Sequence, residues 1–151
     1  MGETIQVIEE EILTLIMSTL KTSLQAALKK VQNQYDDMLP LPMPELYDYF
    51  VDPAAMKSYP GLSVSCQKND ELRTNRTSFR SRLSYSLLLV INSDHGEKKA
   101  YRYMAALKET LRKLNCVAGV VNFDSVVYFM PLSSETGWVK IAEMVMSVEK
   151  Y

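Results

Sequence analysis

The strongest periodic signal in the chain lies in residues 4–33. Apolar side chains recur there at steps of three and four residues, the spacing of one helix face: Ile5, Ile8, Ile12, Leu15, Ile16, Leu20, Leu24, Leu28 and Val31. Thr4 is a suitable N-cap, and Glu9–Glu11 lie near the positive end of the helix dipole. The pattern therefore predicts a long amphipathic helix over 4–33, about 45 Å in length at ~1.5 Å per residue.

The next segment, residues 38–60, contains five prolines, at positions 40, 42, 44, 53 and 60. Proline removes a helical hydrogen bond, so the helix cannot continue here. The segment is rich in Tyr and Met, which makes it apolar enough to be ordered. We expect an extended crossing with a short turn at Asp52–Met56.

Two strands are predicted in the middle of the chain. Gly61–Gln67 alternates between apolar and polar residues, as a half-buried strand does. Residues 68–79 have no apolar period and are expected to form an exposed loop. Arg80–Asn92 is a long strand whose second face begins polar and becomes apolar at Leu88 and Val90. We expect that end to be covered on both faces, by a helix and by either the first helix or a neighbouring subunit.

The last third predicts a helix over 94–114, with Asp94 and Glu97 as a capping-box-like pair. Two apolar segments follow, Val117–Phe123 and Ser125–Leu132, joined by a turn or a bulge. Trp138–Glu149 fits both a strand and a helix by period. Its Val, Ile and Met content favours a strand.

These elements predict a single α+β domain over 1–151, with a mainly antiparallel sheet of about four strands and both helices packed on it. The 151-residue chain is 47% hydrophobic and 23% charged, with a formal net charge of −1. This balance is that of a globular protein, and it does not favour nucleic-acid binding by the molecule as a whole. The N-terminus lacks the basic region of a signal peptide, and no apolar run is long enough to cross a membrane.

The sequence predicts no catalytic, cofactor or metal site, and hence no enzyme. The one histidine, His95, is interpreted as a surface or capping residue. Cys66 and Cys116 are far apart and form no CxxC, which suits a reducing cytoplasm. Phosphate-binding glycine motifs are absent. The paired carboxylates at 36–37 and 70–71 are interpreted as solvated surface.

Four arginines fall within ten positions: Arg73, Arg76, Arg80 and Arg82. Arginine is enriched at protein interfaces and also serves phosphate contacts. Acidic Asp70 and Glu71 adjoin the group, and aromatic residues are scarce beside it. A subunit contact, a nucleic-acid contact and an ordinary solvated loop all remain open for this segment.

The order of these segments resembles the tail terminator (tail-completion, or minor tail) proteins of long-tailed bacteriophages. The resemblance covers most of the chain. It includes the N-terminal helix, the turn at Asp52-Pro53 and Ser58–Val64, which is similar to a "YP-aliphatic-x-V" strand entry with Gly61 inserted. It also includes Ala100–Leu107, similar to "A-x-x-Y-x-x-A-L", and Trp138-Val139 opening a Val-rich strand.

The resemblance implies a structural virion protein at the head-proximal end of the tail, assembled in the host cytoplasm. Such proteins form a homo-hexameric ring, sometimes from a monomer, that caps the tail tube, stops its polymerisation and offers a surface to a head-completion or neck protein. DNA passes through the lumen without tight binding, and no cofactor or membrane is involved. The implied subunit, tube or lumen contacts are Arg73, Arg76, Arg80, Arg82, Leu88 and Val90. Another head–tail connector (a neck or head-completion protein) and an unrelated small-ligand-binding α+β domain remain as alternatives.

Overall fold

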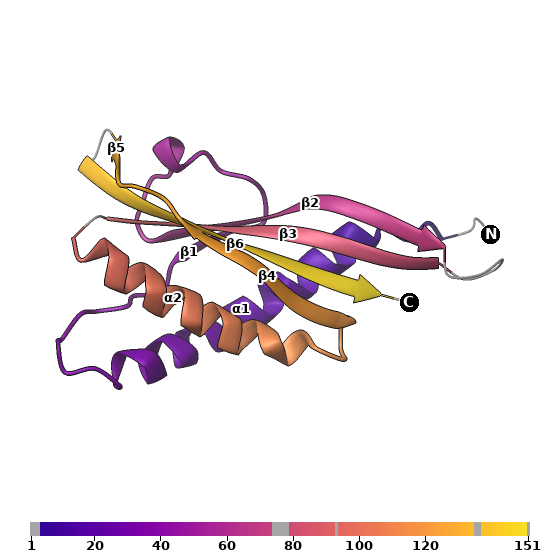
Figure 1. Ribbon diagram of the computed structural model, residues 1–151, viewed down its shortest axis with the longest axis horizontal. Helices are drawn as coiled ribbons and strands as arrows, with labels where there is room; N and C mark the ends of the chain where they lie inside the picture. Colours follow the sequence, from indigo (N-terminus) through magenta and orange to yellow (C-terminus); the bar gives the residue numbers. More distant parts are fainter. Residues whose placement is uncertain (1–3, 74–78, 93, 135–136, 151) are drawn as a thin grey trace.

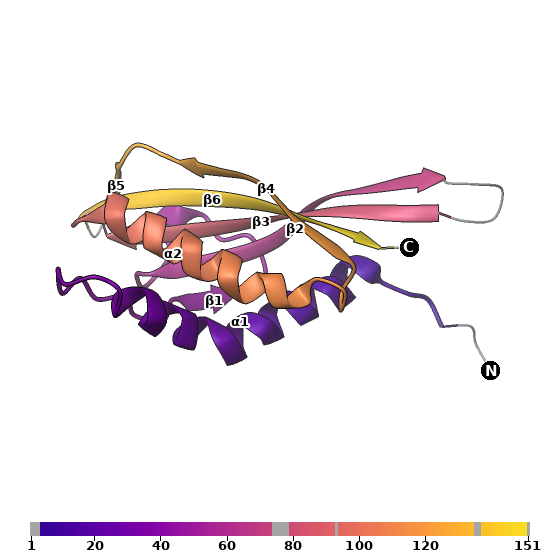
Figure 2. The same cartoon turned by 60° about the horizontal axis from the view of Figure 1, so that its bottom comes forward.

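The computed structural model describes residues 4–73, 79–92, 94–134 and 137–150. Within these residues the fold is α+β, with two α-helices on one face of a mostly antiparallel sheet (Figures 1 and 2). The strand order is β1-β2-β3-β6-β4, and β5 pairs with the first part of β6. Among the strands that the structure describes, only the β1–β2 pair is parallel.

The helices are α1 (Ile8–Gln32) and α2 (Gly96–Leu111), and a short 3-10 turn at Arg112–Leu114 continues α2. The strands are β1 (Glu45–Tyr47), β2 (Gly61–Arg73), β3 (Phe79–Asn92), β4 (Val120–Tyr128), β5 (Leu132–Ser134) and β6 (Gly137–Lys150). The described chain thus has six strands where about four were predicted. The two additions, β1 and β5, are three residues long and carry too little pattern to be recognised in sequence.

Helix α1 is shorter than predicted, because residues 4–7 stay extended and Val7 occupies the N-cap position without a side-chain hydrogen bond. The prediction of Thr4 as the cap was wrong. Most of the predicted apolar stripe is buried and packs with α2 and the inner face of the sheet in the main core, but Ile5 and Leu15 are exposed. Tyr85 on β3 donates a hydrogen bond to the carbonyl of Glu9 at 2.8 Å, which attaches the start of α1 to the sheet.

The predicted exposed loop over 68–79 is mostly strand. Residues 68–73 continue β2 and residue 79 begins β3, in a register that runs from Gly61↔Val90 to Arg73↔Phe79; residues 74–78 lie outside the described part. This end of the β2–β3 hairpin extends beyond α2 (Figure 1). It showed no apolar period in sequence because the polar side chains of Lys68, Asn69, Glu71 and Arg73 lie in solvent rather than on a core.

The second helix begins later than predicted, and the Asp94–Glu97 capping pair does not form. His95 occupies the N-cap position in the left-handed conformation (φ 50°, ψ 33°), with no side-chain cap. The inner parts of the two apolar segments that follow form one strand, β4, over Val120–Tyr128, with a bulge between Phe123 and Ser125; Leu132 belongs to β5. The bulge was thus correct and the turn was wrong. The last segment is a strand, β6, paired to β3, β4 and β5.

A second, smaller core lies on the sheet face that the helices do not cover. Leu88 and Val90 are 8% and 0% exposed there. They pack with Met56 of the proline-rich crossing, with Val139 and Ile141 of β6, and with partly buried Tyr47, Val51 and Tyr59. The covering element is therefore the crossing of the same chain, and neither α1 nor a second subunit is needed. The predicted turn in the crossing is a 3-10 turn at Pro53–Ala55, capped by Asp52, whose side chain accepts a hydrogen bond from Ala54 at 2.9 Å.

Candidate assembly interface

The sheet has two long edges, and one of them is protected by charge. Strand β1 covers β2 only at residues 61–63, so the rest of β2 is an edge within the described chain. That edge carries Lys68, Asp70, Glu71 and Arg73. Charged side chains on an edge strand discourage pairing with another sheet. The β2 edge is therefore poorly suited to strand addition.

The opposite edge, β4, lacks this protection. Its nine residues include one charged side chain, Asp124. That carboxylate already accepts a hydrogen bond from Arg82 at 3.2 Å and one from Ser147 at 3.3 Å, so it is held inside its own sheet. Val120 and Val127 are exposed. An exposed apolar edge without charge or proline is a template for a partner strand.

The backbone of β4 offers its hydrogen-bonding groups to such a partner. The amide of Phe129 donates to the carbonyl of Ile141 at 2.9 Å, so residue 129 faces β6. Hydrogen-bonding groups alternate between the two sides of an antiparallel strand. Those of Val126 and Tyr128 consequently point away from β6, toward the free edge.

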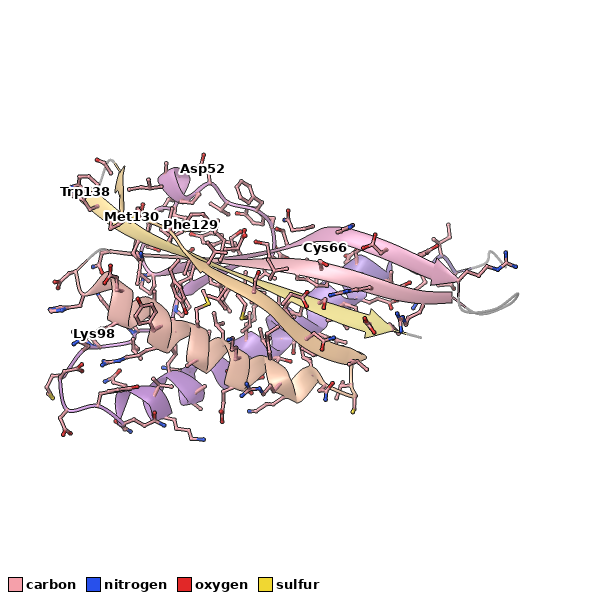
Figure 3. All side chains as sticks on the ribbon, viewed as in Figure 1. Asp52, Cys66, Lys98, Phe129, Met130 and Trp138 are labelled. Carbon is pink, nitrogen blue, oxygen red and sulfur yellow. The ribbon has the colours of Figure 1, made fainter. Side chains whose placement is uncertain are left out.

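A surface of large apolar side chains continues from this edge around the end of the sheet. We call it the apolar end surface; it consists of Val127, Tyr128, Phe129, Met130, Leu132 and Trp138. Met130 is 80% exposed and Trp138 60%. Figure 3 shows Phe129, Met130 and Trp138 gathered at the β5 end of the sheet. Clusters of this kind on a soluble domain mark contacts with a partner.

The apolar end surface is held in place by contacts beneath it. Tyr128 meets Tyr101 of α2 in an edge-to-face pair with ring centroids 4.8 Å apart. Burial raises the pKa of the Tyr128 phenol, and Tyr101 adds to the effect. Lys140, which is buried in β6, donates a hydrogen bond to the carbonyl of Phe129. The surface is therefore anchored to α2 and β6, and its exposed side chains are presented by a fixed backbone.

Arg73, Arg80 and Arg82 lie on β2 and β3, but they do not form one patch. Arg80 pairs with Glu149 at 3.7 Å and Arg82 with Asp124 at 3.2 Å, both across the sheet. Arg73 is exposed at the end of β2. Arg76 lies outside the described residues. Leu88 and Val90 are in the second core, where the crossing covers them.

The side chains considered for chemistry do not converge on a site. His95 lies 3.7 Å from Asp94 at the start of α2. Within the described residues, no group of three or more His, Cys, Asp or Glu side chains is placed to hold a metal ion. In the same part of the chain no helix is long and apolar enough to cross a membrane. One carboxylate differs from the solvated surface predicted for it: Asp37 forms a close ion pair with Arg102.

Sequence reasoning missed the β4 edge. The scarcity of charge in 117–132 is visible in the sequence. What the sequence does not reveal is that β6, the last strand, inserts between β3 and β4 and leaves β4 outermost. Comparison with models of known protein families gives no match, and comparison with curated proteins gives no significant relative.

Proposed function

We propose that this chain is a structural phage protein, a tail terminator that forms a ring on the tail tube, ends its polymerisation and offers an attachment surface to the head or neck. The observation that carries the proposal is the unprotected β4 edge with its apolar end surface, seen beside the charged β2 edge of the same sheet. A domain with charged side chains on one sheet edge and apolar side chains on the other is suited to binding a protein partner at the apolar edge.

The order of segments in the sequence gives this assembly role its particular form, through its resemblance to tail terminators. A ring needs two different patches on each subunit, meeting head to tail and closing on themselves. The apolar end surface, at one end of the sheet, is one such patch or the contact with the tube. The proposed protein catalyses no reaction and binds no cofactor. DNA passes through the ring without tight binding, in keeping with the net charge of −1.

The test is whether the apolar end surface drives association. We expect the wild-type chain to form rings, alone or on tail tubes, and to end tube growth in a mixture with tube protein. Met130→Ser with Trp138→Ser removes two exposed side chains and should weaken ring formation or capping without unfolding the chain. Tyr49 and Phe50 are also exposed but lie on the crossing, so Tyr49→Ser with Phe50→Ser is the matched control. Equal effects of the two double variants would contradict the role of the end surface.

A further inference from the structure

The face of the helical layer that points away from the sheet carries a basic groove between α1 and α2. The groove holds ≈ 330 Å³, and two small residues, Ala27 and Ala105, are part of its lining. Three cations line it: Lys30, Lys108 and Arg112. An adjoining hollow of ≈ 150 Å³ shares Ala27, Lys30 and Glu109 and adds Lys113. We define the basic groove by Lys30, Lys108, Arg112 and Lys113.

The groove has an excess of positive charge. Its single anion, Glu109, is paired with Lys30 at 3.1 Å. Arg112 lies over the ring of Phe123, with 5.8 Å between the guanidinium carbon and the ring centroid. None of the ion pairs among the described residues involves Lys108 or Lys113. The groove therefore offers cations to an acidic partner.

The same chain carries a complementary acidic turn. Glu9, Glu10 and Glu11 are consecutive in the first turn of α1. Glu10 and Glu11 are exposed, and no described cation pairs with any of the three. Ile5 and Val7, exposed in the extended segment before the turn, add apolar contact area next to the charge.

The acidic turn cannot reach the basic groove of its own chain. Both lie along α1, and Glu10 precedes Ala27 by seventeen residues, which is about 25 Å at ~1.5 Å per residue. Two complementary charge patches that cannot meet within one subunit can meet between subunits. Because the patches differ, the contact is head to tail, the type that closes into a ring.

We propose that the acidic turn of α1 in one copy of this chain docks in the basic groove of the next copy, and that this contact joins the subunits of the ring. The inference rests on the proposed function and names the contact that the ring requires. It assigns the occupant of the groove as a second copy. Nucleic acid is the competing occupant for a basic groove.

The experiment reverses the charges of each patch separately. Variant A carries Glu10→Lys and Glu11→Lys; variant B carries Lys108→Glu and Lys113→Glu. In either variant alone, the turn and the groove of neighbouring copies carry charge of the same sign. Each variant should therefore self-associate about tenfold or more weakly than wild type. In a mixture, the lysine-bearing turn of A meets the glutamate-bearing groove of B, and the acidic turn of B meets the basic groove of A. Alternating A and B subunits therefore restore every contact in a ring with an even number of subunits. Association should recover in the mixture, and wild-type association should weaken with rising salt.

A matched control carries Lys21→Glu and Lys57→Glu, an equal change of charge at exposed residues outside the groove. It should associate like wild type, and circular dichroism should show all variants folded. Variants A and B that associate as well as wild type, or whose mixture does not recover, would overturn this contact. Loss of binding to duplex DNA in variant B while its self-association stays intact would also overturn the contact, because it would make nucleic acid the occupant of the groove.

The two proposals fail in different ways. If wild-type chains form rings and cap tubes while A and B do the same, the charge contact is wrong and the proposed function stands. If the wild-type chain neither associates nor caps tubes at any salt concentration, both are wrong.

Discussion

The guanidinium of Arg102 donates two hydrogen bonds to the carboxylate of Asp37, at 2.9 Å and 2.6 Å. The ring of Tyr35 lies against the same guanidinium, with 3.8 Å between the ring centroid and the guanidinium carbon. A bidentate arginine–carboxylate pair has a fixed geometry. It connects the segment after α1 to the buried side of α2, and so holds the start of the crossing against the helical layer.

This pair predicts a dependence of stability on pH. The hydrogen bonds from Arg102 lower the pKa of Asp37 from 3.8 to about 2. A carboxyl whose pKa is lower in the folded state stabilises the fold above its unfolded pKa, and this contribution is lost as the pH falls through the folded value. Asp37→Asn should therefore lower the free energy of unfolding near neutral pH, and its difference from wild type should shrink between about pH 4 and pH 2.

Denaturant unfolding across that pH range checks the prediction. Asp36→Asn, a change at the exposed neighbouring carboxylate, is the control and should behave like wild type. A difference between Asp37→Asn and wild type that stays constant with pH would mean that the ion pair is not the cause.

Truncation of Leu88 distinguishes a role in the core from a role at an interface, because only a core residue should affect the stability of the monomer. The crossing covers Leu88, so Leu88→Ala should lower the free energy of unfolding by about 2–5 kcal/mol, as truncation of a buried leucine does. Leu132→Ala, at an exposed position of the end surface, should change it by about 0.5 kcal/mol or less. Urea unfolding of the monomer measures both. A neutral Leu88→Ala would show that the crossing does not pack there.

Gly119 stands at the entry to β4 with φ 141°, where a Cβ would lie 2.2 Å from the carbonyl oxygen of Glu149. Gly137 also has a positive φ, 121°, but a Cβ there would meet nothing within 4 Å. Gly137→Ala should cost only backbone strain, about 1–3 kcal/mol. Gly119→Ala should cost more, because β4 must also move away from β6. Thermal unfolding that ranked the two in the opposite order would contradict this arrangement.

The arginines predict different outcomes along the hairpin. Arg82 pairs with Asp124 at a half-exposed position, so Arg82→Ala should lower the free energy of unfolding by about 1 kcal/mol or less. If Arg73 and Arg76 contact a neighbouring subunit, Arg73→Glu with Arg76→Glu should impair assembly while the monomer stays folded. Urea unfolding measures the stability of Arg82→Ala, and sedimentation velocity measures the assembly of the Arg73/Arg76 variant. Tail completion that is unchanged in the Arg73/Arg76 variant would remove these two arginines from the interface.

The α+β class, the two helices and the long strand β3 could be predicted because their apolar periods extend over more than ten residues, and β6 could be predicted from its Val, Ile and Met content. The start of α1 and the cap of α2 could not. Both depend on backbone conformation at single positions, such as the left-handed His95, which side-chain pattern does not encode. The end of β2 at 68–73 was missed because its residues are mostly polar and give no apolar alternation to detect.

The candidate site was less predictable than the fold. From the sequence, Leu88 and Val90 were candidates for an interface, because a second apolar face on a strand must be covered by another element. The sequence does not show which element covers it. The crossing supplies the cover through Met56, Val51 and Tyr59. The β4 edge depends on strand order, which is set by long-range pairing of β6 with both β3 and β4.

The most direct test of the proposed function is electron microscopy and mass measurement of the chain mixed with tail tube protein. The account predicts rings at tube ends, tubes of limited length, and loss of both in the variant with Met130→Ser and Trp138→Ser but not in the one with Tyr49→Ser and Phe50→Ser. A wild-type chain that stays monomeric, binds no tube protein and leaves tube length unchanged would contradict it.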